Sequence, residues 1–261
     1  MGRAPPGAVT DDLRAVAVEA AHAAADVLME RYEAAGGPRD LRTKSTPTDL
    51  VSAADLEAEG AIRDVLHRRR PDDAILGEEG DEVAGTSGLR WVVDPLDGTV
   101  NYLFGLPQWC VSVACEGHVG VILDPIRGEL FEAVPGQSAT LDAEPLRPSS
   151  RTELATALVA TGFNYDSGVR ARQAEVVGRV LPRVADIRRM GSAALDLAWT
   201  AAGRYDAFYE RGVSAWDIAA GTMLCATAGL EVRDLEPRDG LPGGVLAAPA
   251  AVVDELFELV G

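Results

Sequence analysis

Two aspartates stand three residues apart where a short apolar run, WVV, gives way to DPLDGT. At the mouth of a buried strand, Asp94 and Asp97 would offer two carboxylates to a hard cation such as Mg²⁺, which prefers oxygen ligands. Gly98 and Thr99 follow at the expected start of a short helix, where free backbone N–H groups can hold a phosphate. A metal beside a phosphate is the arrangement of metal-assisted phosphate hydrolysis. Asp-Pro and Asp-Gly are also common turn dipeptides, so a plain turn is the structural alternative.

Three further acidic residues stand at the ends of expected strands or helices. Glu78 directly follows the apolar run AILG, which we interpret as a short strand. Asp55 and Asp217 each stand at an expected helix start. Each also lies three residues after a serine, Ser52 or Ser214, so each could instead complete a helix-capping box. The spacing leaves both interpretations open for Asp55 and for Asp217.

Five segments of the chain resemble the inositol monophosphatase family in the same order. They are TKSTPTDLVSAAD, which ends at Asp55, then GEE around Glu78, WVVDPLDGTVNY, GSA at 191–193 and WDIAAG around Asp217. The resemblance covers roughly residues 41–220, with a weaker match at each end. It implies a mixed α/β (α+β) chain with the layered αβαβα sugar-phosphatase fold, made of two tightly joined halves and usually a homodimer.

The resemblance implies two or three Mg²⁺ ions where these segments meet. The implied metal ligands are Glu78, Asp94, the carbonyl oxygen of Leu96, Asp97 and Asp217. Lys44 lies on a loop that is mobile in the family and takes part in binding a further metal there. The role of Asp49, on the same loop, stays open. Activity is expected to depend on Mg²⁺ and to be inhibited by lithium.

The resemblance also implies which residues act in catalysis and which hold the substrate. The implied catalytic residues are Thr99, Asp55 and Glu78, of which Thr99 and Asp55 would position the attacking water. The implied substrate contacts are Asp97, Gly98, Thr99, Gly191, Ser192, Ala193, Glu210 and Asp217. Ser192 could at the same time be the ordinary N-cap of the helix that follows it. No Cys, His or Ser has the partners of a nucleophilic triad, so we expect no covalent intermediate.

The favoured substrate is a small polyol phosphate monoester, with inositol monophosphate as the first choice. Histidinol phosphate, fructose 1,6-bisphosphate and a phosphorylated nucleotide are alternatives with the same mechanism. Nucleotide-specific relatives tend to carry Lys-Glu-Phe after the Gly-Thr of the signature, whereas this chain has Val-Asn-Tyr at 100–102. Two non-catalytic alternatives are a regulatory protein on the same scaffold and an acidic metal-binding protein.

The composition limits the partners that the chain can have. Its 24 basic and 41 acidic residues give a net charge of −17, which argues against binding nucleic acid, because phosphate-backbone contacts need a basic surface. An anionic substrate would need cations in the site to reverse the local charge. Three cysteines in apolar surroundings, no signal-peptide pattern and no long apolar run predict a cytoplasmic protein that does not enter a membrane.

The elements that must position these residues follow from apolar spacing. Residues 11–35 predict an amphipathic helix that Thr10 could cap. The strand WVV is expected to end at Asp94-Pro95, because proline cannot continue a central ladder. Pro148–Ser150 is the expected boundary between an N-terminal half, 1–148, which carries the signature, and a C-terminal half, 149–261, which completes the site. Alternating strands and helices after this boundary suggest a βαβ-like second half.

Overall fold

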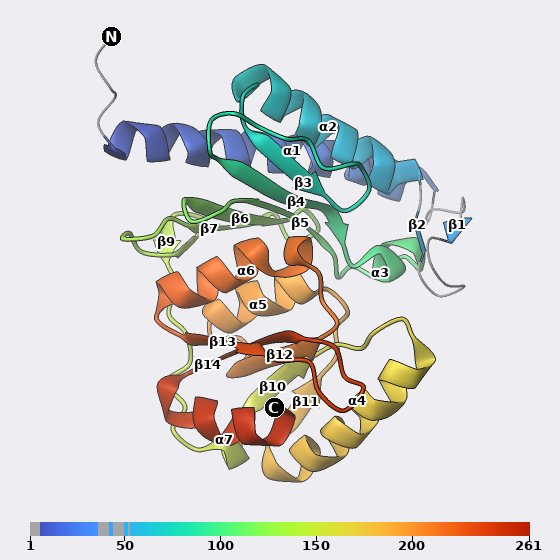
Figure 1. Cartoon of the computed structure of the whole chain (residues 1–261), viewed down its shortest axis with the longest axis vertical. Helices are drawn as coiled ribbons and strands as arrows, with labels where there is room; N and C mark the ends of the chain where they lie inside the picture. Colours follow the sequence, from blue (N-terminus) through green and yellow to red (C-terminus); the bar gives the residue numbers. More distant parts are fainter. Residues whose placement is uncertain (1–5, 36–41, 44–49, 52) are drawn as a thin grey trace.

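Helices and sheets are stacked in the order helix, sheet, helix, sheet, helix (Figure 1). The computed structural model describes residues 6–35, 42–43, 50–51 and 53–261. Both sheets are mixed, because each contains parallel and antiparallel pairs. The layered αβαβα, mixed α/β fold expected from the sequence is therefore confirmed. Lys44, Asp49 and Ser52 lie outside the described residues.

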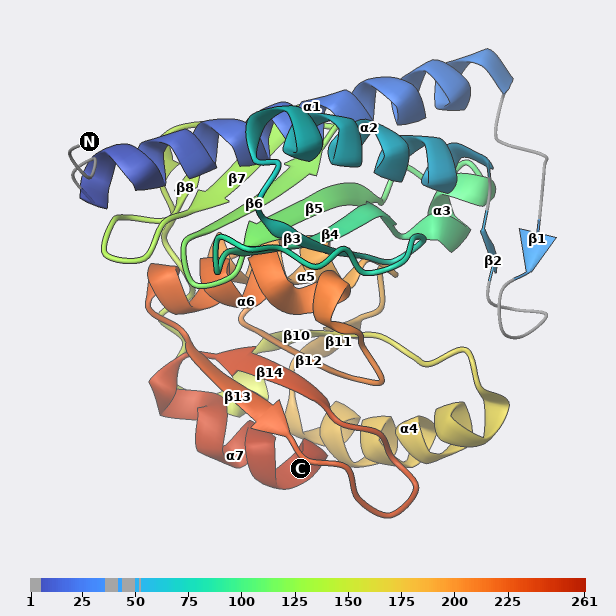
Figure 2. The ribbon, with the colours of Figure 1, turned by 45° about the horizontal axis from the view of Figure 1, so that its top comes forward.

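Two long helices, α1 (Pro6–Ala35) and α2 (Ala53–Arg69), cover the outer face of the first sheet (Figures 1 and 2). Apolar residues at three- and four-residue spacing, such as Leu13, Val16 and Ala20, form the buried side of α1. The prediction that Thr10 caps this helix is wrong, because α1 already begins at Pro6. Proline is tolerated in the first turn of a helix, where its missing N–H would have no intrahelical partner.

The first sheet has seven strands in the order β3-β4-β5-β6-β7-β8-β9. Only β3 and β4 pair in parallel, and the other neighbours form an antiparallel meander. The strands are β3 (Ala74–Gly77), β4 (Arg90–Asp97), β5 (Cys110–Cys115), β6 (Val119–Asp124), β7 (Glu129–Ala133), β8 (Thr140–Leu141) and β9 (Glu144–Pro145). A separate antiparallel pair is formed by β1 (Arg42–Thr43) and β2 (Leu50–Val51).

Strand β4 does not end at Asp94-Pro95, so that prediction is wrong. The strand continues to Asp97, but its pairing with β5 is irregular. Asp94 pairs with Ser112, and the next paired residue is Asp97, opposite Cys110. Pro95 lies in this interruption, where no N–H donor is needed for pairing with β5. The irregularity lets one strand carry both aspartates to its end.

Helices α5 (Ala193–Ala201) and α6 (Ala215–Ala228) fill the layer between the two sheets (Figure 1). Small residues such as Ala198 and Ala220 are fully buried there, which lets helix and sheet backbones approach closely. The short α3 (Thr99–Leu103) follows β4 directly and is expected from the glycine that precedes it. These three helices bring chain segments from both sheets to one place.

The second sheet has five strands in the order β11-β10-β12-β14-β13. Its strands are β10 (Leu158–Thr161), β11 (Asp186–Arg188), β12 (Ala207–Arg211), β13 (Glu231–Leu235) and β14 (Gly244–Ala248). Helices α4 (Ser167–Val180) and α7 (Ala250–Val260) cover its outer face, and short 3₁₀ turns lie at Leu154–Thr156 and Leu181–Arg183. Because β10 and β11 are parallel neighbours joined through α4, the βαβ-like expectation holds here. The first sheet ends at Pro145 and the second begins at Leu158, but the division into halves at 148 stays a prediction.

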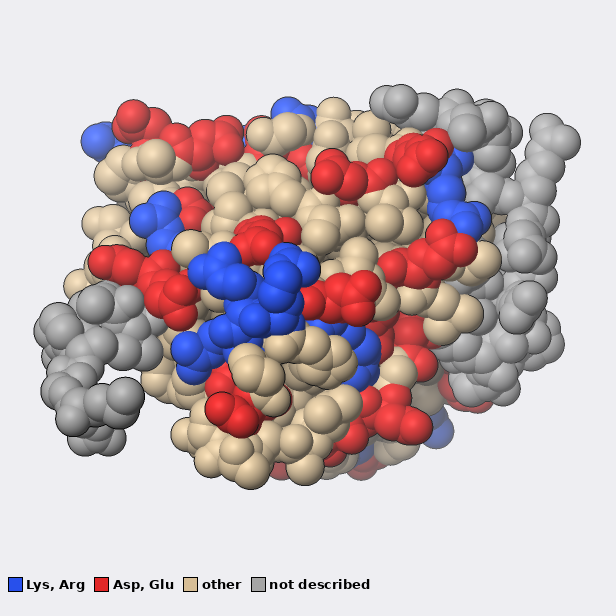
Figure 3. Space-filling view, turned by 90° about the horizontal axis from the view of Figure 1, so that it is seen from above, with Lys and Arg blue, Asp and Glu red and all other residues tan. Residues whose placement is uncertain are grey.

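The outer face of α1 and α2 carries both signs of charge (Figure 3). Arg68 and Arg69, near the end of α2, both form ion pairs with Glu19 on α1. Arg70, just beyond the helix, pairs with Asp12 and Asp73. The basic residues at this end of α2 are therefore paired with carboxylates. None of the helices in the described part of the chain is long and apolar enough to cross a lipid bilayer.

Candidate functional site

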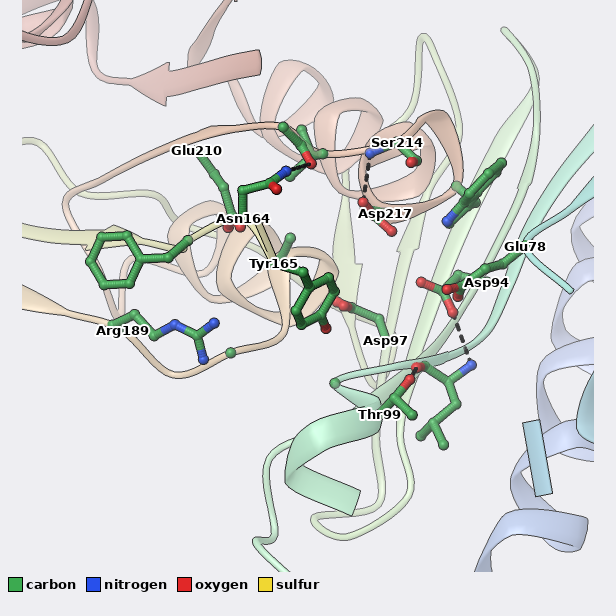
Figure 4. Close-up of a pocket in the computed structure, with 18 residues that line it drawn as sticks. Glu78, Asp94, Asp97, Thr99, Asn164, Tyr165, Arg189, Glu210, Ser214 and Asp217 are labelled. Carbon is green, nitrogen blue, oxygen red and sulfur yellow. Dashed lines mark hydrogen bonds between the residues drawn. The ribbon is translucent and has the colours of Figure 1, made fainter. Parts of the chain in front are cut away.

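A pocket of about 260 Å³ opens where segments from both sheets meet (Figure 4). Ten of the residues singled out from the sequence line it. They are Glu78, Asp94, Leu96, Asp97, Gly98, Thr99, Gly191, Ala193, Glu210 and Asp217. Two others, Asp55 and Ser192, are buried behind the wall and touch residues that line it. The fold thus gathers residues that are up to 139 positions apart, Glu78 and Asp217, in one pocket.

Asp94 sits at the irregular end of β4 and is almost completely buried. Its Oδ1 accepts a hydrogen bond from the backbone N–H of Leu96 at 2.9 Å. This bond holds the Asp94 side chain against the irregular part of β4. Leu96 is buried as well and also lines the pocket. The interruption of the β4–β5 ladder therefore places a carboxylate and a nearby backbone segment at the pocket wall.

Asp97 joins the signature segment to the start of α5. Its Oδ2 accepts a hydrogen bond from Ser192 Oγ at 2.7 Å and one from the Ala194 N–H at 2.6 Å. Ser192 Oγ also accepts the N–H of Leu195, so the N-cap interpretation of Ser192 is confirmed. Ser192 is not among the residues that line the pocket; it holds Asp97 from behind. Gly191, which does line the pocket, has the left-handed φ of 90° that glycine adopts readily.

Thr99 and Asp55 form a buried contact between α3 and α2. Thr99 Oγ1 lies 3.1 Å from Asp55 Oδ1, to which it can donate, and 3.1 Å from the carbonyl oxygen of Leu96. Asp55 is fully buried and is not among the residues that line the pocket, and its contact with Thr99 connects it to the pocket. Gly98 precedes α3 with a φ of 101°, a conformation that side-chain-bearing residues rarely adopt.

Glu59 on α2 holds the segment that carries Glu78, and the sequence interpretation missed it. The buried Glu59 carboxylate accepts the N–H of Glu79 at 2.7 Å and an ion-paired hydrogen bond from Arg63 Nε at 2.7 Å. A side chain at Gly77 would collide with this carboxylate, because an added Cβ would lie 2.5 Å from Oε1. The only available signal was a glutamate one helical turn after Asp55, which is common on any helix surface.

Asp217 caps α6 and also lines the pocket. Its Oδ2 accepts the backbone N–H of Ser214 at 2.6 Å, as in a capping box at the start of α6. The same residue lines the pocket. A cap and a pocket carboxylate are therefore compatible at this position.

The carboxylates of the pocket lie close together; Asp94 is buried and the others are half-buried. Burial, reinforced by the negative charges of Glu78, Asp97 and Asp217, raises the pKa of Asp94 well above its usual value. Burial also raises the pKa of Asp97 to about 6, although the hydrogen bonds from Ser192 and Ala194 oppose this change. For Glu210, burial and the charge of Asp97 raise the pKa to about 8. A bound cation would therefore stabilise the ionised form of these carboxylates.

The donor set fits a hard divalent cation. Glu78, Asp94, Asp97 and Asp217 supply carboxylate oxygens and Leu96 supplies a carbonyl, which are the ligand types of Mg²⁺. Among the described residues, no group of three or more acidic, histidine or cysteine side chains is assembled closely enough to hold a metal ion. The carboxylates thus line one pocket, but their oxygens do not converge on one metal position. Their raised pKa values indicate that a cation there would relieve mutual repulsion.

The remaining wall of the pocket was not expected from the sequence. It consists of Phe163, Asn164, Tyr165, Arg189, Gly212, Val213, Ser214 and Trp216. Phe163, Asn164 and Tyr165 follow β10, and Arg189 follows β11. Three of them had a signal in the sequence: Trp216 begins WDIAAG, Ser214 belongs to the possible capping box, and Arg189 lies two residues before GSA. Phe163, Asn164 and Tyr165 lie in a loop without a motif, and Gly212 and Val213 lie in the short connection between β12 and α6.

Comparison with known proteins decides the family. The profile described as the inositol monophosphatase family matches residues 10–259. The chain belongs to this family. In Mycobacterium tuberculosis strain H37Rv, a relative named inositol-1-monophosphatase SuhB is 43% identical, over 94% of this chain and 92% of the relative. The resemblance inferred from five short segments therefore extends over almost the whole chain.

Solved structures of family members share the fold. The extragenic suppressor protein suhB from Bartonella henselae is 35% identical, with a TM-score of 0.86, over 95% of this chain and 98% of that one. The inositol monophosphatase from Anabaena is 34% identical, with a TM-score of 0.80, over 96% of this chain and 95% of that one. A relative from Pasteurella multocida is named Nus factor SuhB and is 39% identical, over 94% of both chains. Family members of similar identity thus carry two kinds of name.

Proposed function

We propose that this protein is a Mg²⁺-dependent phosphatase that hydrolyses a small polyol phosphate monoester, with inositol monophosphate as the first choice of substrate. One observation carries the proposal. A single pocket collects the carboxylates Glu78, Asp94, Asp97 and Asp217 beside Thr99 at the start of α3. Such a set provides for metal ions, for a phosphate and for an attacking water in one place. The mycobacterial relative named inositol-1-monophosphatase supports the same reading.

The proposed metal sites use residues from three segments. Glu78, Asp94 and the carbonyl of Leu96 would hold one ion. Asp94, Asp97 and Asp217 would hold a second once their carboxylates move closer together around it. Lys44 lies on the segment proposed to help bind a third, outside the described residues. When bound, Mg²⁺ supplies positive charge for the phosphate and lowers the pKa of water near it.

The side chains of the protein position the reactants. As the water attacks, Thr99 Oγ1 would take a proton from it and pass its own proton to the Asp55 carboxylate, 3.1 Å away. Backbone N–H groups of Gly98 and Thr99 would hold phosphate oxygens as negative charge accumulates on them. Glu210, with Gly191 and Ala193, faces the part of the pocket proposed for the polyol hydroxyls.

Phosphate release from a panel of esters tests the proposal. The panel contains inositol monophosphate, histidinol phosphate, fructose 1,6-bisphosphate and a phosphorylated nucleotide, each with Mg²⁺ and with EDTA. We expect the highest kcat/KM for inositol monophosphate, loss of activity with EDTA, and inhibition by lithium. Activity that survives EDTA would overturn the metal proposal, and a clear preference for another ester would overturn the substrate proposal.

The family member named Nus factor SuhB favours a second function, a regulatory role without turnover on the same scaffold. The net charge of −17 opposes direct binding to nucleic acid, although charge does not exclude a protein partner. The two functions separate in the same assay. If the folded protein releases phosphate from no ester at any Mg²⁺ concentration, the catalytic proposal fails and the regulatory one stands.

We also propose a homodimer in the cytoplasm. Phe104 and Leu106, in the segment after α3, are exposed to 70% and 51% and would gain from burial in an interface. Cys110, Cys115 and Cys225 are buried free thiols, as expected in a reducing compartment. Light scattering on the eluting protein measures the mass, and a monomer at micromolar concentration would contradict the dimer.

A further inference from the structure

The pocket contains one positive side chain among the described residues that line it. Five carboxylates belong to the lining, from Glu78, Asp94, Asp97, Glu210 and Asp217, whereas Arg189 is the single arginine or lysine. Figure 4 shows Arg189 on the side of the pocket away from Glu78 and Asp94, with its guanidinium directed inward. In a chain with a net charge of −17, this placement of a cation needs a reason.

Two neighbours hold the Arg189 side chain over the pocket. Its guanidinium carbon lies 5.9 Å from the centre of the Phe163 ring, within the range of a cation–π contact. Its Nη1 passes over Gly191, where an added Cβ would lie only 2.6 Å away. The preceding residue, Arg188, is different, because it forms an ion pair with Asp186 on the exposed surface of β11. The two adjacent arginines are therefore a natural pair of test and control positions.

Glu210 supplies the opposite chemistry in the same half of the pocket. Its carboxylate occupies the space beside Gly162, where an added Cβ would lie 2.1 Å from Oε1. The positive charge of Arg189 acts on this carboxylate and opposes the rise in its pKa that burial causes. The pocket thus has an acceptor and a donor close enough for their charges to interact.

We propose that Arg189 is a substrate-binding residue that, together with Glu210, recognises neighbouring hydroxyl groups of a neutral polyol carried by the phosphate ester. A hydroxyl group both donates and accepts, so a diol can donate to the carboxylate and accept from the guanidinium at once. The inference rests on the proposed function and names the part of the substrate that is remote from the phosphate.

The charges also determine which substrates are rejected. An ammonium group on the substrate would meet Arg189, and like charges in a site of low dielectric repel strongly. A second phosphate would lie near the carboxylates of Glu210 and the buried Asp196, both of which interact with Arg189. The pocket therefore favours an uncharged polyol over an amino-bearing ester or a bisphosphate.

Steady-state kinetics of Arg189→Ala, Arg189→Lys and the control Arg188→Ala test the inference with three esters. For inositol monophosphate, Arg189→Ala should raise KM at least about tenfold with little change in kcat, because it removes charge-assisted hydrogen bonds to the polyol. Phenyl phosphate, which has no hydroxyl groups to recognise, should be unaffected. Histidinol phosphate should become a better substrate. Arg189→Lys should retain part of the affinity, and Arg188→Ala should match the wild type.

Equal KM values for inositol monophosphate in Arg189→Ala and the wild type would overturn the inference. A selective loss of fructose 1,6-bisphosphate turnover would also overturn it, since Arg189 would then bind a second phosphate. A binding measurement makes the test independent of turnover. Calorimetry would measure the affinity of inositol monophosphate, in the presence of Mg²⁺, for the Thr99→Ala protein and for the Thr99→Ala, Arg189→Ala double variant. If the wild type hydrolyses no ester but Arg189→Ala still weakens this binding, the proposed function fails and the inference stands.

Discussion

The hydroxyl group of Thr99 lies 3.1 Å from Asp55 Oδ1 and equally far from the Leu96 carbonyl oxygen. A hydroxyl has one proton, so it can donate to only one of these acceptors at a time and can still accept from a water. Asp55 is fully buried behind Thr99 and does not line the pocket. The pair therefore has the geometry of a relay in which Thr99 lines the pocket and Asp55 lies behind it.

Thr99→Ala should lower kcat for inositol monophosphate by at least about 10²-fold, because proton transfer by a positioned group contributes roughly 10²–10⁴-fold. Mg²⁺ affinity should barely change, since Thr99 is not proposed as a metal ligand. Thr99→Ser should retain substantial activity, because it keeps the hydroxyl. The measurements are kcat and Tm on the wild type and both variants. A Thr99→Ala protein that melts lower yet turns over normally would show that the contact with Asp55 is only structural.

Asp94→Asn should abolish most activity and yet stabilise the metal-free protein. Burial and three neighbouring carboxylates raise the pKa of Asp94, so ionising it costs the folded protein more than the unfolded chain. Stability is then lost as the pH rises above the ordinary carboxyl value toward the raised folded-state value. Asparagine keeps the shape and can still accept the Leu96 N–H. With EDTA, we expect Tm to rise by roughly 2–4 °C, which corresponds to about 1 kcal/mol.

Thermal melts at about pH 5 and about pH 8 provide the control for Asp94→Asn, because the gain in Tm should be larger at the higher pH. Adding Mg²⁺ should raise the Tm of the wild type more than that of the variant. A variant that is less stable than the wild type at both pH values without metal would contradict the charge-repulsion argument.

Asn101 links the signature segment to the loop before α5. Its Nδ2 donates to the carbonyl oxygens of Gln108 at 2.7 Å and Met190 at 2.8 Å, and the side chain is buried. Asn101→Asp keeps the shape but has no donor, so two carbonyls lose their partner. We expect a loss of about 1–3 kcal/mol in the free energy of unfolding, measured with urea. KM should rise as well, because Met190 precedes Gly191 in the pocket wall. An unchanged KM would separate this contact from substrate binding.

The parts of the site that were predicted from the sequence are those that the chain carries within a few residues. Asp94, Asp97, Gly98 and Thr99 stand together because one strand end and one helix start are local features. The αβαβα layering, by contrast, came from family resemblance, since apolar spacing shows which face of an element is buried but not which element covers it. The failure at Pro95 has the same origin, because the interrupted β4–β5 ladder that accommodates it depends on a partner strand.

The residues that were missed act across long distances in the sequence. Glu59 matters because β3 ends beside α2, and the N–H of Glu79 meets its carboxylate 20 positions away. Arg189 faces Glu210 because parallel pairing places β10 between β11 and β12. A single glutamate or arginine in a stretch that is expected to be exposed carries no sequence pattern that would mark it as a site residue. Only the packing of the elements identifies it as part of the site.

Gly98 and Gly105 flank α3 with similar, left-handed backbone conformations. Gly98 and Gly105 have φ values of 101° and 71°, so alanine at either position pays about 1–2 kcal/mol for the left-handed conformation. An added Cβ at Gly105 meets nothing within 4 Å, whereas at Gly98 it would lie 2.9 Å from the carbonyl oxygen of Gln108 and 3.1 Å from Trp109 Cβ. Trp109 is fully buried and packs against the Tyr102 ring, with 5.0 Å between the ring centres.

Gly98→Ala should therefore destabilise the protein by about 1–3 kcal/mol more than Gly105→Ala, because overpacking adds to the backbone strain. Urea unfolding of both variants measures the difference. Gly105→Ala should keep the kcat of the wild type, since its added methyl group points into open space. Gly98→Ala should lose turnover even where it is fully folded, because the shift needed to relieve the contact with Gln108 moves Thr99. Equal losses of stability in the two variants would mean that the segment around Gln108 yields, and that the start of α3 is not held in place by this packing.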